Sequence, residues 1–128
     1  NGGSMTEGIG IMRLVDNFRQ ARIDHAVNLP DQDLVTLSRY IRDEDGIVLG
    51  SSSALNVAGA LAAALRKGPG HRIVTFSCDL GERSVSKLYN PEYLRGRGLN
   101  PDPEPIDVLM TRYRELGDKV LEVNWNND

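Results

Sequence analysis

The sequence contains one cysteine, Cys78, and only two histidines among its 128 residues. A single cysteine cannot form an intramolecular disulfide, and it fits a reducing environment. The two histidines lie far apart in the sequence, so no spacing typical of a metal site is present. We therefore expect no metal site, and we expect the protein in the cytoplasm or another reducing intracellular compartment.

Clustered positive charge and long apolar runs are also missing. The formal net charge is −3, and no group of lysines and arginines forms a basic patch, which argues against a nucleic-acid partner. The longest apolar run lies within residues 54–65 and is too short to span a bilayer. No charged-then-apolar leader begins the sequence. We expect neither a nucleic-acid partner nor a membrane partner.

What is present is the composition of an ordinary globular chain. Hydrophobic residues make up 40% and charged residues 26% of the sequence. A chain of this length forms at most one domain and can bury a moderate core.

Residues 46–58 are the stretch around which the chain is organised. Ile47, Val48 and Leu49 form the apolar run of a short buried strand. Gly50 permits a sharp turn, and three serines follow it at the predicted start of a largely apolar helix over residues 54–65. A helix N-terminus offers unpaired N–H donors and partial positive charge, which suit a phosphate, a carboxylate or a ring nitrogen.

The serines have a simpler interpretation. Serine before a helix most often serves only as its N-cap. The turn also lacks the spacing of a dinucleotide-binding fingerprint or a P-loop. Taken alone, it does not separate a ligand site from a capped helix.

A second apolar run, over residues 73–78, predicts another buried strand after the stop signal Gly68-Pro69-Gly70. Strand, helix and strand with short connections predict a βαβ unit, hence a parallel sheet. Ligands of such sheets lie beyond the carboxyl ends of the strands, where the 50–53 turn and the 78–83 loop both begin. We expect the two loops to converge on one site.

The remaining segments predict further elements around this unit. Helical spacing predicts helices over residues 11–18, from Asp31 as N-cap to about residue 42, and over 106–116. Residues 26–29 are a candidate short strand, and Asn90-Pro91 predicts the start of a short helix. Three prolines within residues 100–105 predict a stiff, extended linker.

Three motifs together resemble one known family. They are Thr6-Glu7-Gly8-Ile9-Gly10, the segment Gly50-Ser51-Ser52-Ser53-Ala54-Leu55-Asn56-Val57-Ala58, and the segment Cys78-Asp79-Leu80-Gly81-Glu82-Arg83-Ser84-Val85-Ser86-Lys87-Leu88-Tyr89. In this order and spacing they resemble the C-terminal part of cysteine synthase (O-acetylserine sulfhydrylase) and of its relative cystathionine β-synthase. These are fold type II pyridoxal-phosphate enzymes.

The resemblance implies an α/β fold, with a parallel sheet covered by helices on both faces. It implies that residues 1–98 are the C-terminal part of the pyridoxal-phosphate-binding catalytic domain. Residues 99–128 lie beyond the resemblance and are expected to be a Pro-rich linker with an amphipathic helix as an extension.

The resemblance also implies a set of cofactor-binding residues. Ser52 matches the serine whose hydroxyl meets the pyridine nitrogen of pyridoxal 5'-phosphate. A neutral hydroxyl leaves that nitrogen largely unprotonated, which favours β-elimination over transamination. Gly50 matches the turn before this serine, and Asp79 lies in the loop beside the ring. Gly8 and Gly10 match the loop on the substrate side.

The sequence departs from the family in several places. Ser51, Ala54 and the pair Ser84-Val85 replace residues common in the family. The Schiff-base lysine, the substrate-carboxylate loop and the phosphate loop belong to the family's N-terminal part and are absent here. Lys67, Lys87 and Lys119 do not lie in the context of that lysine. We therefore expect no catalytic residue in this chain, and no activity from it alone.

Two hypotheses follow from the resemblance. In the first, the chain completes a cysteine-synthase-like enzyme together with the N-terminal portion of that enzyme. The enzyme would replace the β-substituent of an activated serine, such as O-acetylserine, by a sulfur nucleophile, and would form a homodimer. In the second, the chain is a non-catalytic binding or scaffold domain derived from this fold.

Overall fold

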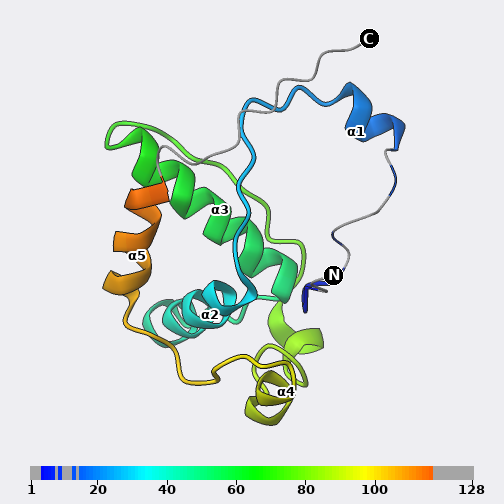
Figure 1. The fold of residues 1–128 in the computed structure, drawn as a ribbon, viewed down its shortest axis with the longest axis vertical. Coiled ribbons are helices and arrows are strands. Elements are labelled where there is room, and N and C mark those ends of the chain that lie inside the picture. The colour runs from blue at the N-terminus through cyan, green and yellow to red at the C-terminus, as the bar shows by residue number, and fades with distance from the viewer. Residues whose placement is uncertain (1–3, 8, 10–12, 14, 117–128) are drawn as a thin grey trace.

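The computed structural model describes residues 4–7, 9, 13 and 15–116. Five α-helices and a short 3₁₀ helix form in this part of the chain (Figure 1). They are α1 (Asp16–Gln20), α2 (Asp31–Asp45), α3 (Ser51–Lys67), η1 (Gly81–Ser84), α4 (Pro91–Gly96) and α5 (Ile106–Glu115).

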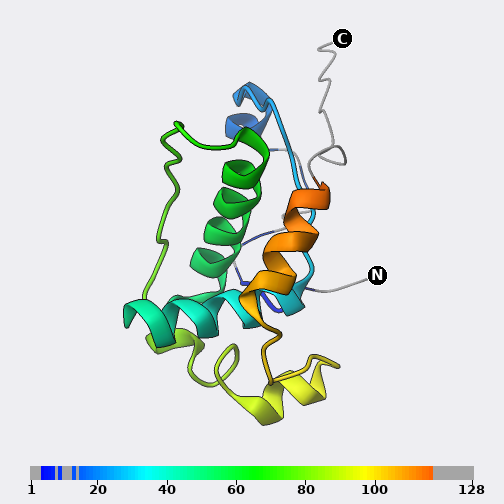
Figure 2. The same ribbon diagram turned by 90° about the vertical axis from the view of Figure 1, so that its left-hand side faces the viewer.

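The core lies where α2, α3 and α5 pack against one another. Figure 2 shows α3 and α5 side by side, with α2 crossing near one end of α3. Leu34 and Val35 of α2, Ala54 and Ala58 of α3, and Leu109 of α5 are all fully buried. The small alanines let the other two helices approach α3 closely, which is ridge-into-groove packing with short side chains at the contact.

The helices expected from the sequence largely form, with corrected ends. The predicted start of α3 in the serine turn is confirmed, since the helix begins at Ser51. Helix α4 begins at Pro91 as predicted, and the Asn90 side chain caps it by accepting hydrogen bonds from the amides of Glu92 and Tyr93. Asp31 is not the N-cap of α2. That place is taken by Pro30, and the Asp31 carboxylate accepts from Ser4 and the amide of Met5 instead.

The first predicted helix is shorter and more exposed than the pattern indicates. Helix α1 covers Asp16–Gln20, and Phe18 is 44% exposed. Residues 11, 12 and 14, which would make most of its apolar face, lie outside the described residues.

The expected parallel sheet does not form among the described residues. Residues 73–78 are extended without strand pairing, with Phe76 77% exposed, and residues 26–29 form no strand beyond an isolated bridge position at Ala26. An antiparallel bridge joins Leu49 to Leu80, and the parallel sheet predicted from the sequence is not confirmed in this part of the chain. An apolar run indicates that a segment suits a buried strand. A strand forms only where a neighbouring strand provides hydrogen bonds for its backbone N–H and C=O groups.

The extended segment after α3 runs back along that helix (Figure 2). The Asn56 side chain holds it there by donating to the carbonyl oxygen of Phe76 at 3.0 Å. Thr75 donates in return to the carbonyl oxygen of Asn56 at 3.3 Å. The segment therefore delivers Asp79 to the N-terminal end of α3 without a sheet.

Candidate functional site

The N-terminus of α3 presents unpaired backbone donors. Gly50 is the N-cap residue, and its carbonyl oxygen accepts from the amide of Ala54 at 2.9 Å. The amide of Ser51 donates to the Ser84 hydroxyl at 3.2 Å. The amides of Ser52 and Ser53 have no acceptor among the described residues, and neither does the Ser52 hydroxyl. This helix end therefore keeps free donors and partial positive charge.

The Asp79 loop is bound directly to this turn. The Ser53 hydroxyl, on a fully buried residue, donates to the carbonyl oxygen of Asp79 at 2.9 Å and accepts from the amide of Asp79 at 3.1 Å. The amide of Gly50 donates weakly to the same carbonyl oxygen, at 3.4 Å. A Cβ atom on Gly50 would lie 1.8 Å from Oδ1 of Asp79. Any larger residue here would therefore displace the Asp79 carboxylate, although the φ of −69° is itself open to any residue.

The segment from Gly81 to Tyr89 closes the other side of the turn. The amide of Gly81 donates to the carbonyl oxygen of Val48 at 2.7 Å, and a Cβ on Gly81 would lie 2.2 Å from Cγ1 of Val48. The Tyr89 hydroxyl donates to the carbonyl oxygen of Leu49 at 2.9 Å. Together these contacts fix the backbone that leads into α3.

These segments enclose a cavity of about 210 Å³. Its lining residues are Met5, Glu7, Ser51, Ser52, Asp79, Arg83, Ser84, Lys87 and Leu88. Both signs of charge are present, since Glu7 and Asp79 are acidic and Arg83 and Lys87 are basic. The lining thus suits a polar ligand that carries both anionic and cationic groups.

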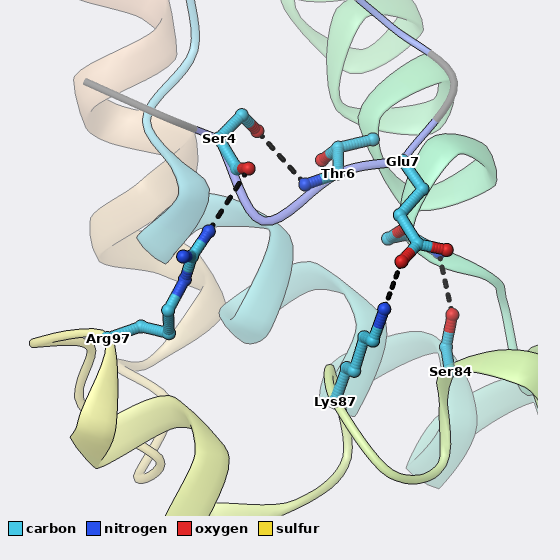
Figure 3. A network of polar contacts seen from close by, with 7 residues as sticks. Ser4, Thr6, Glu7, Ser84, Lys87 and Arg97 are labelled. Carbon is cyan, nitrogen blue, oxygen red and sulfur yellow. Dashed lines mark hydrogen bonds and ion pairs between the residues drawn. The ribbon is translucent and has the colours of Figure 1, made fainter. Parts of the chain in front are cut away.

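An ion pair crosses the cavity rim. Figure 3 shows the Lys87 side chain pointing at the carboxylate of Glu7. The hydrogen bond and the positive charge of Lys87 hold the pKa of Glu7 below its usual value, and the bond to Glu7 raises the pKa of Lys87. Arg97 also joins the N-terminal segment to the C-terminal side of the cavity, since it donates to the carbonyl oxygen of Ser4 at 3.2 Å (Figure 3).

Comparison with known proteins identifies the family. No family model matches the chain. It is 46% identical over 109 residues to cysteine synthase 2 of Schizosaccharomyces pombe, a match that covers 83% of the chain. It is also 40% identical over 91 residues, or 71% of the chain, to cysteine synthase of Dictyostelium discoideum. The chain belongs to the cysteine synthase family.

The chain corresponds to only part of its cysteine synthase relatives. The matches cover 28% of the S. pombe protein and 24% of the D. discoideum protein, so the chain spans about a quarter of their length. It is also 30% identical over 101 residues to L-cysteine desulfhydrase Cds1 of Mycobacterium tuberculosis, across 77% of this chain and 27% of that protein. The sequence resemblance to the C-terminal part of cysteine synthases is confirmed.

The structure brings some of the residues matched to the cysteine synthase family together. Ser52 and Asp79 line the same cavity, and Gly50 lies against Asp79. Gly8 and Gly10 lie outside the described residues, although the neighbouring Glu7 lines the cavity.

The lysines are also placed. Lys87 lies at the rim of this cavity, whereas Lys67 lines a different cavity at the far end of α3. Lys119 falls outside the described residues.

Sequence analysis missed the residues that hold the site in place. Ser53, Ser84 and Tyr89 bond to the turn or to the Asp79 loop, yet none was singled out. The three consecutive serines offered a clue to the role of Ser53. Successive residues at a helix start point in different directions, so one serine can face a ligand while another packs inward. Ser84 stands out in the sequence only as a departure from the family.

The site shows no sign of a metal centre. No group of three or more histidine, cysteine, aspartate or glutamate side chains that could hold a metal ion occurs in the described part of the chain. None of the helices described here is both long and apolar enough to cross a membrane.

Proposed function

We propose that this chain forms part of a pyridoxal-phosphate-dependent enzyme that makes cysteine or a related amino acid by β-replacement. The observation that carries the proposal is the placement of Ser52. Its free hydroxyl and free amide line a cavity of about 210 Å³ beside Asp79, in a chain of the cysteine synthase family. The substrate class is an activated serine of the O-acetylserine type, and the second substrate is a sulfur nucleophile.

The residues present suit the cofactor. When bound, pyridoxal 5'-phosphate withdraws electrons from the α-carbon of the amino acid, and the protein tunes this by what it places at the pyridine nitrogen. Ser52 would meet that nitrogen with a neutral hydroxyl that has no other partner among the described residues. Gly50 lets the Asp79 loop pack against the turn, and Asp79 supports the loop beside the ring. Gly8 and Gly10 would line the substrate side.

The enzyme we propose needs a second part that carries the Schiff-base lysine. The apolar strand-like segments of this chain support such a partner. Val74 and Phe76 are 79% and 77% exposed, and residues 73–78 keep unpaired backbone groups. Strands of the N-terminal portion would pair with this segment and complete the parallel sheet that the chain does not form by itself.

Two reaction types fit this site. Attack of a sulfur nucleophile after loss of the β-substituent gives a transferase, and loss without replacement gives a lyase. Similarity to both cysteine synthases and an L-cysteine desulfhydrase supports this pair of chemistries. We favour replacement, in a homodimer within a reducing intracellular compartment. We also propose the division into residues 1–98, within the catalytic domain, and an extension over 99–128.

The test of the partner uses borohydride reduction followed by denaturing intact mass spectrometry of the purified assembly. A second polypeptide, or an extended chain, with a reduced cofactor on a lysine supports the enzyme. A single species of this chain without any adduct contradicts it and supports the alternative, a non-catalytic binding or scaffold domain.

The role of Ser52 is tested by Ser52→Ala in the assembled enzyme. We expect turnover to fall about tenfold or more while cofactor content stays near that of the unmodified enzyme, because only the tuning of the ring is lost. Ser51→Ala is the matched control, since its hydroxyl lines the same cavity without a partner. Equal turnover in Ser52→Ala and the unmodified enzyme would remove Ser52 from the site.

A further inference from the structure

Tyr89 is joined to the turn that carries Ser52 by one hydrogen bond. Its hydroxyl donates to the carbonyl oxygen of Leu49 at 2.9 Å. Leu49 is buried, and its carbonyl oxygen accepts no other hydrogen bond from the described residues. A buried carbonyl without a donor is costly, so this bond sets where the backbone lies just before Gly50.

The Tyr89 ring is in turn held by Arg39 of α2. The guanidinium carbon of Arg39 lies 5.0 Å from the ring centroid, and Arg39 is 7% exposed. Nη1 of Arg39 is buried and has no hydrogen-bond partner among the described residues. The face of the Tyr89 ring therefore offsets part of the free energy that the Arg39 guanidinium loses on leaving water. Such a cation–π contact is stronger at a buried site than at an exposed one. Helix α2 thus holds the Tyr89 ring in place through Arg39, and the Tyr89 hydroxyl holds the backbone of the turn through Leu49.

Ser84 holds the other side of Gly50. Its hydroxyl accepts from the amide of Ser51, and its carbonyl oxygen accepts from the amide of Tyr89, both at 3.2 Å. The short segment from Ser84 to Tyr89 therefore bonds to the chain on both sides of Gly50. Ser84 also lines the cavity, whereas Tyr89 does not, so removal of the Tyr89 hydroxyl breaks one contact of the turn without altering the lining.

We propose that Tyr89 is a positioning residue for Ser52, and that its hydroxyl sets the direction in which the turn presents Ser52 to the cavity. The proposal rests on the proposed function, because the role of Ser52 belongs to that function. Tyr89 itself does not line the cavity. It acts through the carbonyl oxygen of Leu49, three residues before Ser52.

The test is Tyr89→Phe in the assembled, cofactor-loaded enzyme. This change removes the hydroxyl and keeps the ring under Arg39. We expect the amides of Gly50, Ser51 and Ala54 to exchange with solvent about fivefold faster, the factor that a typical hydrogen bond is worth. We also expect a shift of the cofactor absorption maximum, and a similar fall in kcat with KM unchanged.

Tyr93→Phe is the matched control. Tyr93 is half-buried on α4, its ring lies 5.9 Å from the guanidinium carbon of Arg97, and its hydroxyl has no hydrogen-bond partner among the described residues. The Tyr93→Phe change should leave the amide exchange rates, the cofactor absorption maximum and kcat unchanged. Arg39→Met tests the same contact from the other side and should speed exchange of the same three amides by a smaller factor.

Unchanged amide exchange in Tyr89→Phe would overturn the proposal. Faster exchange with an unchanged absorption maximum would overturn it as well, because the turn would then move without affecting the cofactor. Failure of the proposed function is read separately in the unmodified enzyme, which would show no cofactor absorption at all.

Discussion

A buried carboxylate, Asp33, ties the last helix to the core. Asp33 is 1% exposed, and its Oδ1 accepts from Nη2 of Arg112 at 2.5 Å. Arg112 also donates to Glu104 at 2.6 Å. The hydroxyl of Tyr113, likewise buried, interacts with the Asp33 carboxylate but makes no hydrogen bond of good geometry with any described residue. Burial and the negative charge of Asp33 raise the pKa of this hydroxyl.

Removal of that hydroxyl should stabilise the protein. We expect Tyr113→Phe to raise the free energy of unfolding by up to about 1 kcal/mol at neutral pH, because a buried hydroxyl without a hydrogen bond of good geometry is lost. In the native state Tyr113 keeps its proton above pH 10, whereas the unfolded chain releases it near the ordinary value of 10.0. The raised pKa of Tyr113 therefore contributes to the free energy of unfolding below pH 10. This contribution is lost as the pH rises from the unfolded-state pKa through the higher native-state pKa.

Stability should therefore fall less steeply above pH 10 in Tyr113→Phe than in the unmodified protein. Urea unfolding at neutral pH and above pH 10 measures both effects. Tyr40→Phe is the control at neutral pH, since Tyr40 is 42% exposed and no buried group is altered. Parallel pH profiles for Tyr113→Phe and the unmodified protein would contradict this account.

At the scale of elements, the turn before α3 and the Asp79 loop depend on each other. Gly50→Ala places a Cβ atom 1.8 Å from Oδ1 of Asp79, at a backbone conformation without strain. We expect a loss of about 1–2 kcal/mol in the free energy of unfolding, since the Asp79 side chain must turn away. In an Asp79→Ala background the same change should cost much less, a non-additivity typical of residues in contact.

Gly59→Ala is the matched control within α3. A Cβ atom there meets nothing within 4 Å, so this change should stabilise the helix by about 0.5–1 kcal/mol. Urea unfolding of the single and double variants measures the coupling. Strictly additive effects of Gly50→Ala and Asp79→Ala would show that the contact is not the cause.

The sequence allowed the helices to be predicted better than their surroundings. Helical spacing and local stop signals identified α2, α3 and α5, because these depend on neighbours three and four residues away. The strand predicted at residues 73–78 does not form, because pairing depends on a partner strand that the described residues do not supply. The sequence predicted that the loops carrying Ser52 and Asp79 would meet at the edge of a parallel sheet. In the structure they do meet, but side-chain hydrogen bonds from Asn56 and Ser53 bring them together.

The contacts that hold the site were out of reach of local patterns. Tyr89 and Leu49 are 40 residues apart, and Ser51 and Ser84 are 33 apart. Each pairing depends on how α2 and α3 pack, which spacing within one segment does not encode. The family resemblance supplied the role of Ser52, but it did not supply the side chains that hold its turn.

At the scale of the whole molecule, a large apolar surface remains exposed. Val74, Phe76 and Leu80 are 79%, 77% and 63% exposed along one extended segment. A surface of this kind marks an interface in a folded protein. We have proposed that the rest of the enzyme covers it.

Phe76→Ser tests that interface. The change should leave the free energy of unfolding of this chain within about 0.5 kcal/mol, because the side chain is mostly exposed already. It should weaken association with the lysine-bearing part, measured by light scattering after size-exclusion chromatography and by cofactor retention. Val108→Ser on α5, at a residue 49% exposed on another element, is the control. Undiminished association in Phe76→Ser would show that this segment is not at the interface.

The packing of α5 against both α2 and α3 has a consequence for biosynthesis. Asp33 and Arg112 are 79 residues apart, and Leu109 and Tyr113 fill the core that α2 and α3 begin. A ribosome that adds residues in order releases α2 and α3 well before α5, so their apolar faces wait in the open for the last helix. During that interval the exposed apolar faces favour aggregation, and a pause in translation before residue 106 would lengthen the exposure.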